Sequence, residues 1–280
     1  MPAVIDTHTH VVSPDRARFP LETPDFPADW VRESPVPVDG LLAALDAGGV
    51  RGAVLVQAKG AYGFDNSYVA EARAADPARL VNAAVIDLSA PDREAVLRYW
   101  CGERGILGLR VFNIPPADPE WLSDPSLSRV LRLASELGAR LSVCVLAPDL
   151  PAVGRVLAAV PDLPIAIDHC GFVELGEGTA SPGAKALTAL AAFDNVRLKV
   201  TTTMLTMAEQ AGMTAADVVE WLSAEFGTHR LMWGSDYPQH HSEPYPEIVD
   251  YGRRACARLS PDEQARFLGG TALELWPELS

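Results

Sequence analysis

Three histidines and one aspartate stand where they could act on a single bound molecule. His8 and His10 are two residues apart in a short apolar segment that also contains Asp6. Successive side chains of a β-strand point to opposite faces, so we expect Asp6, His8 and His10 to share one face. Two imidazoles on one face can bind one metal ion or one substrate group, although two polar residues near a strand end can also be purely structural.

His169 and Asp236 each follow a further apolar segment. Alone, either residue is more often structural, because an aspartate after a strand frequently caps the next helix. Together with His8 and His10 they supply three imidazoles and one carboxylate. A carboxylate can act as a general base, and imidazoles can bind a divalent metal or stabilise a negative charge that develops on oxygen.

Eight segments rich in valine, isoleucine and leucine could position these side chains. They span residues 3–12, 52–58, 80–87, 106–112, 139–146, 164–171, 196–203 and 231–238, and stretches with apolar residues at helical spacing separate them. Eight such repeats, with no glycine-rich phosphate turn after the first strand, favour a closed parallel barrel. We therefore predict an α/β fold, a (β/α)8 TIM barrel, with residues 1–280 as a single domain and flanking helices within 245–279.

Composition and charge argue against several classes of partner. Hydrophobic residues make up 48% of the chain, and the formal net charge is −14. This acidity argues against nucleic acid, since phosphate contacts need a basic face. No apolar run approaches the roughly 20 residues that cross a bilayer, and the N-terminus lacks the pattern of a secretory signal. We expect a cytoplasmic protein that binds a small-molecule substrate and no membrane, and a homo-oligomer stays open.

The motifs around these four residues resemble those of a known family. The opening Asp6-Thr7-His8-Thr9-His10, the segment Asp168-His169-Cys170-Gly171 and the segment Gly234-Ser235-Asp236-Tyr237-Pro238 are similar to the amidohydrolase superfamily, in its amidohydrolase-2 branch. Within that branch the chain looks closest to the lactonase group, which includes 2-pyrone-4,6-dicarboxylate lactonase and sugar-acid lactonases. The resemblance runs from about residue 3 to 276 and implies a distorted barrel of the metallo-dependent-hydrolase type.

The resemblance also implies roles for the four residues. Asp236 would be the general base that activates water. His8, His10 and His169 would either hold a divalent metal together with Asp236 or polarise the scissile carbonyl directly.

One departure from the family concerns the metal. Metal-dependent members usually carry a histidine near the end of the fifth strand, where this chain offers only Cys144 as a soft donor. The end of the fourth strand carries Arg110 and offers neither a histidine nor a candidate for a carboxylated lysine. The requirement for a metal, with zinc as the first candidate, therefore stays open.

Two basic residues within apolar strands are candidates for substrate binding. Arg110 and Lys199 would be costly to bury against helices, so we expect them to face the barrel interior or its mouth and to pair with a substrate carboxylate. For Lys199 an internal salt bridge to Asp6, Asp87 or Asp168 is an equal alternative. Further candidates for substrate contact are Gln57, Tyr237, His240 and His241, and the proline-rich segment 13–37, which contains Trp30, could wall the pocket.

The leading hypothesis is a hydrolase that opens a lactone, which carries a carboxylate or derives from a sugar acid, by attack of a water activated by Asp236. One alternative is a metal-dependent non-oxidative decarboxylase of the same branch, against which the missing fifth-strand histidine counts. The alternative from another class is a barrel that binds a small molecule without turnover.

Overall fold

The eight predicted segments form one parallel sheet. The structure, a computed structural model, describes residues 3–22, 28–114, 122 and 124–280. The strands are β1 (Ile5–Thr9), β2 (Gly52–Val56), β3 (Leu80–Val85), β4 (Gly108–Asn113), β5 (Arg140–Val145), β6 (Ile165–Ile167), β7 (Val196–Thr201) and β8 (Leu231–Gly234). Each strand pairs with the next one along the chain, in the order β1 to β8.

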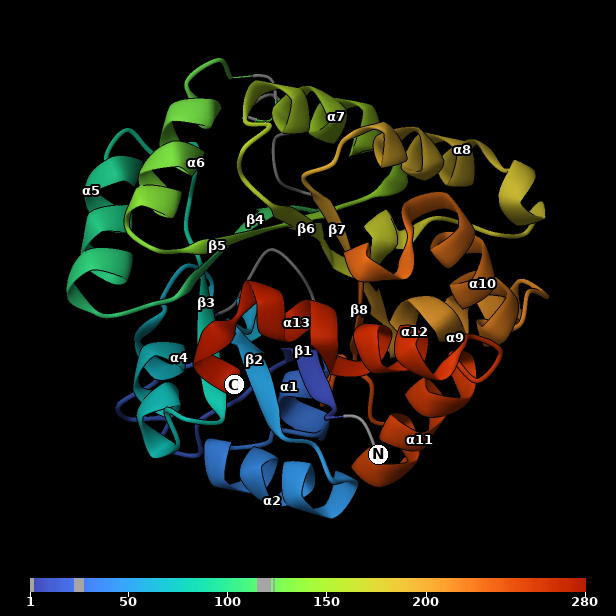
Figure 1. The fold of residues 1–280 in the computed structure, drawn as a ribbon. Helices are drawn as coiled ribbons and strands as arrows, with labels where there is room; N and C mark the ends of the chain where they lie inside the picture. Colours follow the sequence, from blue (N-terminus) through green and yellow to red (C-terminus); the bar gives the residue numbers. More distant parts are fainter. Residues whose placement is uncertain (1–2, 23–27, 115–121, 123) are drawn as a thin grey trace.

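The sheet closes where β8 returns to β1. The backbone N–H of Asp236 donates to the carbonyl of His8 over 2.8 Å, and the N–H of His10 donates to the carbonyl of Tyr237 over 2.8 Å. Thr9 and Tyr237 form a parallel bridge at the same place. Figure 1 shows the strands at the centre with helices around them, so the predicted (β/α)8 TIM barrel is confirmed as a nearly closed barrel.

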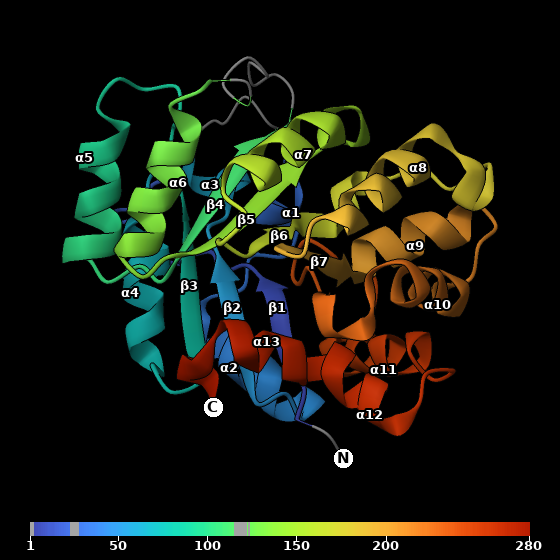
Figure 2. The ribbon, with the colours of Figure 1, turned by 45° about the horizontal axis from the view of Figure 1, so that its top comes forward.

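Helices connect the strands and cover the outside of the barrel. They are α1 (Trp30–Glu33), α2 (Val38–Gly48), α3 (Lys59–Tyr62), α4 (Ser67–Ala72), α5 (Arg93–Leu97), α6 (Leu127–Glu136), α7 (Leu150–Ala159), α8 (Pro182–Ala189), α9 (Thr202–Gln210), α10 (Ala215–Phe226), α11 (Tyr245–Ala255), α12 (Pro261–Ala265) and α13 (Thr271–Leu275). Figure 2 shows α5 to α8 outside the strands and α13 across one end of them. No helix in the described ranges is long and apolar enough to cross a membrane.

Apolar side chains fill the end of the barrel at which the strands begin. They form one cluster of buried residues: Ile5, Val54, Val56, Val81, Ala166, Met232, Ala272, Trp276 and Leu279. Ala272 belongs to α13 and Trp276 follows it, so the end of the chain closes this side of the barrel. A TIM barrel carries its chemistry at the opposite end, where the strands finish.

Asp6 does not share the face of His8, so the strict alternation expected for β1 is wrong. The register between β1 and β2 shifts between Asp6 and Thr9. Asp6 Oδ2 accepts a hydrogen bond from the hydroxyl of Tyr245 on α11, whereas His8 lies beside Asp236. Because the irregularity changes which face each residue takes, Asp6 links β1 to a surrounding helix.

Close packing of α11 on β8 gives a test of the fold. A Cβ added at Gly252 of α11 would lie 2.4 Å from Nε1 of Trp233, which is fully buried. We expect Gly252→Ala to lower the free energy of unfolding by about 1–3 kcal/mol, because a filled core must shift to admit an extra methyl group. Thermal and denaturant unfolding measure the change.

Gly102 is the matched control for this substitution. It is also helical, and an added Cβ would meet only Leu137 at 3.7 Å, an ordinary van der Waals contact. Gly102→Ala should leave stability unchanged or raise it slightly, since alanine favours helix over glycine. Equal stability of the two variants would contradict the packing described for Trp233.

Candidate active site

The strand ends bring His8, His10, His169 and Asp236 together. Nε2 of His8 lies 3.8 Å from Oδ1 of Asp236, and Nε2 of His10 lies 3.4 Å from the same oxygen. Nδ1 of His169 lies 3.9 Å from Oδ2 of Asp236. All four side chains are buried. The convergence anticipated from the sequence is therefore present in space.

Unusual backbone conformations place two of these residues. His169, Cys170, Gly171 and Phe172 have φ values of 53°, 51°, 70° and 49°, and Asp236 has a φ of 62°. The left-handed region costs free energy for residues other than glycine, so the surrounding structure must hold it. The left-handed residues end β6 and β8 earlier than predicted. They also turn the side chains of His169 and Asp236 toward the centre of the site.

The hydrogen bond of His10 fixes which ring nitrogen faces Asp236. Nδ1 of His10 lies 2.8 Å from the carbonyl oxygen of Val56. A carbonyl only accepts, so Nδ1 carries a proton, and Nε2 is the ring nitrogen that faces Asp236, 3.4 Å from its Oδ1.

Asp236 is ionised in this setting. Burial alone raises the pKa of its carboxyl, but His169 and His10 outweigh that effect, and the pKa lies below its usual range. The hydroxyl of Thr203 donates to Oδ2 over 2.6 Å. Oδ1 is buried and accepts no hydrogen bond from the described residues. One oxygen is therefore held in place, and the other is available to a ligand or a water molecule.

His8 and His169 are neutral near pH 7. Burial lowers the pKa of His169 to about 4 and, with the nearby charges of His169, Lys199 and Arg110, lowers the pKa of His8 well below its usual value. Nδ1 of His169 lies 2.8 Å from the hydroxyl of Thr201. Neutral imidazoles keep a lone pair, which a metal ion requires.

The unpartnered atoms of the site fit a divalent metal. One ligand atom each from His8, His169 and Asp236 lie within 4.8 Å of one another. Both ring nitrogens of His8 and Oδ1 of Asp236 are buried without a hydrogen-bond partner among the described residues. Two neutral imidazoles and a carboxylate are a ligand set that zinc accepts, and His10 faces the same carboxylate.

Arg110 and Lys199 share one buried carboxylate. Nε of Arg110 donates to Oδ2 of Asp168 over 2.6 Å, and Nζ of Lys199 lies 3.0 Å from Oδ1 of Asp168. Burial alone raises the pKa of Asp168, but Lys199 and Arg110 outweigh it and hold the pKa below its usual range. Of the two roles considered for Lys199, the geometry supports the internal salt bridge to Asp168.

A narrow pocket opens onto the histidines. Its described lining is His10, Ala28, Trp30, Ala58, Lys59, Gly60, Arg110, Phe112, Ile114, Cys144, His169, Phe172 and Gln239. Trp30 packs against His10 with ring centroids 5.4 Å apart, so part of segment 13–37 does wall the pocket. Residues 23–27 of that segment lie outside the described residues.

The remaining predicted contacts lie outside this lining. Gln57 is buried and donates to the carbonyls of Gly63 and Asp65. Tyr237 packs on Tyr245, with ring centroids 5.0 Å apart. His240 pairs with Glu243 at 3.1 Å, and His241 lies 3.0 Å from the carbonyl oxygens of Pro238 and Gln239. Their contact with substrate stays a prediction.

Sequence reasoning missed several residues of the site. Thr201 and Thr203 hold His169 and Asp236, and Phe172 stacks on His169 with ring centroids 4.4 Å apart. Three successive threonines at the end of an apolar strand were an available signal, because strand ends meet at the mouth of a barrel.

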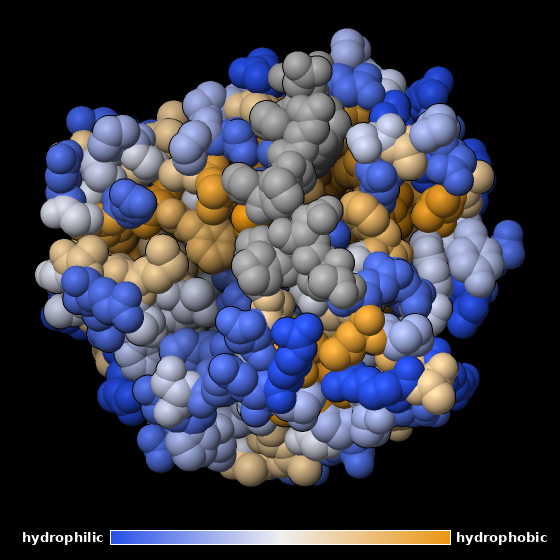
Figure 3. Space-filling model, turned by 180° about the vertical axis from the view of Figure 1, so that it is seen from behind, coloured by the Kyte–Doolittle hydropathy of each residue, from blue (hydrophilic) through white to orange (hydrophobic). Residues whose placement is uncertain are grey.

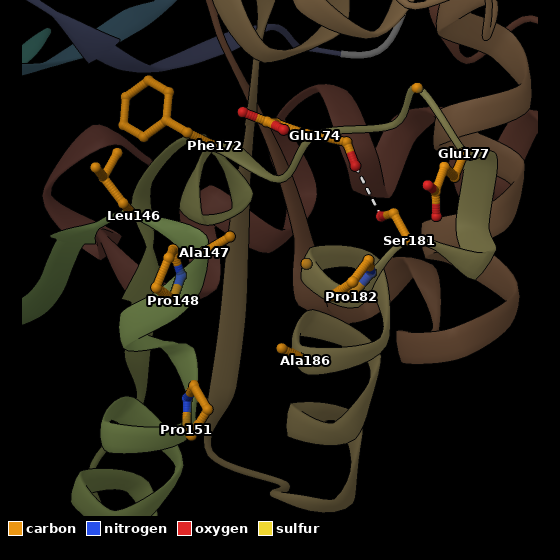
Figure 4. Close-up of a pocket in the computed structure, with 12 residues that line it drawn as sticks. Leu146, Ala147, Pro148, Pro151, Phe172, Glu174, Glu177, Ser181, Pro182 and Ala186 are labelled. Carbon is orange, nitrogen blue, oxygen red and sulfur yellow. Dashed lines mark hydrogen bonds between the residues drawn. The ribbon is translucent and has the colours of Figure 1, made fainter.

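A second hollow lies beside the pocket. It measures about 680 Å³ and lies between the segment that leads into α7 and the start of α8 (Figure 4). Phe172 lines both hollows. The described lining of the second one contains Glu174 and Glu177 but no basic residue, so it is unsuited to an anionic group.

Figure 3 shows the face opposite to that of Figure 1, with hydrophilic side chains forming most of its outline.

The chain is similar to known proteins in both sequence and fold. The chain is 29% identical over 269 residues to the 4-sulfomuconolactone hydrolase of Rhizobium radiobacter, which covers 93% of this chain and 85% of that protein. It is 27% identical over 201 residues to the L-fucono-1,5-lactonase of Burkholderia ambifaria, which covers 68% of each. The proposed 2-pyrone-4,6-dicarboxylic acid hydrolase of Pseudomonas putida has a similar structure, with a TM-score of 0.78, 26% identity and coverage of 99% of this chain and 98% of that one.

The sequence pattern of one family covers nearly the whole chain. The family is described as Amidohydrolase, and its pattern matches residues 5–277, from β1 to the end of the closing helices. The protein therefore belongs to the amidohydrolase family.

Proposed function

We propose that this protein is a hydrolase that opens a lactone bearing a carboxylate. The observation that carries the proposal is the ionised, buried Asp236 with a free oxygen among three imidazoles at the mouth of the barrel. Relatives named as lactonases support the same reaction class.

Asp236 acts on the attacking water. Its carboxylate takes a proton from water while the water oxygen bonds to the carbonyl carbon of the lactone. The bond between that carbon and the ring oxygen then breaks, and Asp236 returns the proton to the departing ring oxygen. General base catalysis of this kind contributes about 10²- to 10⁴-fold to the rate.

The histidines stabilise the charge that the attack creates. We propose that His8, His169 and Asp236 hold a divalent metal, with zinc as the candidate, and that His10 lies next to it. Such an ion polarises a carbonyl and lowers the pKa of bound water to about 7. Around it, Thr201 orients the ring of His169, and the carbonyl of Val56 orients the ring of His10.

Arg110 is the proposed partner of the substrate carboxylate. It lines the pocket, and its Nε is occupied by Asp168. Among the described residues its other hydrogen-bonding contact is a long one, from Nη2 to Nε2 of His169 at 3.5 Å, and the guanidinium lies over the ring of Phe112 at 5.1 Å from the centroid. The terminal nitrogens therefore keep N–H groups for a carboxylate.

Substitution of Asp236 tests the proposed base. Asp236→Asn keeps the size of the side chain but removes the proton acceptor, so kcat/KM for a carboxylated lactone should fall by about 10²- to 10⁴-fold. Product analysis distinguishes ring opening from release of CO2. The exposed Asp162 gives the control Asp162→Asn, which should retain full activity. Wild-type rates in Asp236→Asn would contradict the assignment of the base.

Removal of the metal tests the proposed centre. Purified protein should contain close to one divalent ion per chain by elemental analysis, and dialysis against a chelator should remove the ion and lower lactone hydrolysis by about tenfold or more. His8→Ala should lower the metal content, because it removes one ligand. His229→Ala, at an exposed histidine away from the site, should not. If the metal-free protein kept full activity, the proposed role of the metal would be wrong, and the imidazoles would have to polarise the carbonyl of the lactone.

A further inference from the structure

The cluster of Arg110, Asp168 and Lys199 carries one more positive than negative charge. Asp168 is fully buried, and Arg110 and Lys199 are exposed by only 4% and 1%. Each cation uses a different oxygen of the carboxylate, Oδ2 for Arg110 and Oδ1 for Lys199. Among the described residues no second carboxylate forms an ion pair with either cation.

The charges around the cluster do not cancel this excess. Nδ1 of His8 lies 3.8 Å from Oδ1 of Asp168, and no hydrogen bond joins the two side chains. The charge of Asp236 also acts on Arg110, but no ion pair joins the two; Oδ2 of Asp236 accepts from Thr203, and its Oδ1 faces the imidazoles. An uncompensated charge at a site with little water attracts an anion more strongly than it would in bulk water.

The two cations differ in their access to the pocket. Arg110 lines it, whereas Lys199 is absent from the described lining. Without Lys199, Asp168 would be left to neutralise Arg110 alone, and the guanidinium would offer a substrate anion much less attraction. Lys199 is thus placed to act on a ligand only through Asp168 and Arg110.

We propose that Lys199 determines the preference of this site for anionic substrates without touching them, by occupying Asp168 and so leaving Arg110 with its positive charge. Lys199 is a positioning and specificity residue, and Asp168 is the group that couples it to Arg110. The proposal rests on the proposed function for the identity of the site, since the anion is the carboxylate of the lactone.

Binding of two ligands that cannot be hydrolysed tests the proposal separately from catalysis. The ligands are 3-oxocyclopentane carboxylate, a carbocyclic analogue of a carboxylated lactone that is not a β-keto acid and so does not lose CO2 in solution, and the neutral 3-oxocyclopentane carboxamide. Titration calorimetry of the metal-loaded protein should show the carboxylate binding about tenfold more tightly than the carboxamide. In Lys199→Met this preference should fall to within about twofold, with the affinity for the carboxamide unchanged.

A double variant separates the charge from the structure. Asp168→Asn combined with Lys199→Met removes one charge of each sign, so Arg110 regains its excess charge and the preference for the carboxylate should return. A merely structural role of Lys199 would not be rescued by a second substitution in the core. Lys185→Met, at an exposed lysine of α8, is the matched control and should keep the wild-type preference.

Each outcome decides the proposal. If the wild-type protein binds the carboxylate and the carboxamide with equal affinity, the proposal is overturned without any variant. It is also overturned if Lys199→Met keeps the preference for the carboxylate, or if the double variant fails to regain it. A lactone assay on the wild-type protein, run beside the titrations, reports separately on the proposed function. A selective binding site without turnover would uphold the role of Lys199 and refute lactone hydrolysis.

Discussion

The junction between β1 and β8 is the contact on which the site depends. The N–H of Asp236 donates to the carbonyl of His8, and the N–H of His10 donates to the carbonyl of Tyr237. These two bonds complete the barrel and also fix the proposed base beside two imidazoles. Asp6 reinforces the junction from outside, since its Oδ1 accepts the N–H groups of His8 and Ser235. The contacts that close the barrel are therefore also contacts that assemble the site.

Burial of charge is the second constraint on the site. Two carboxylates, Asp168 and Asp236, are fully buried within one barrel mouth, where an unpaired charge is costly. Arg110 and Lys199 offset the cost of burying Asp168. For Asp236, the hydroxyl of Thr203 binds Oδ2, and the proposed metal would bind at Oδ1. Burial also lowers the pKa of His8 and of His169, which leaves each ring a lone pair that a metal ion could use.

The alternation of apolar segments was enough to predict the barrel, and the positions of His8, His10, His169 and Asp236 at strand ends were enough to predict that they converge. The details of the site could not be predicted in this way. The register shift within β1 and the left-handed turns at His169 and Asp236 depend on contacts between distant segments, and local sequence does not encode them. The choice of Lys199 between substrate and Asp168 depended on distances that only the folded chain provides. The sequence shows Thr203 near the end of the seventh strand, but only the hydrogen bond from its hydroxyl to Asp236 gives it a role in the site.

The central claim is that water, activated by Asp236, attacks the carbonyl carbon of a lactone. Hydrolysis of a carboxylated lactone in water labelled with oxygen-18, followed by mass spectrometry of the product, tests it most directly. The account predicts one labelled oxygen in the new carboxylate and none in the new hydroxyl group. Label in the hydroxyl group, or release of CO2 without ring opening, would contradict it.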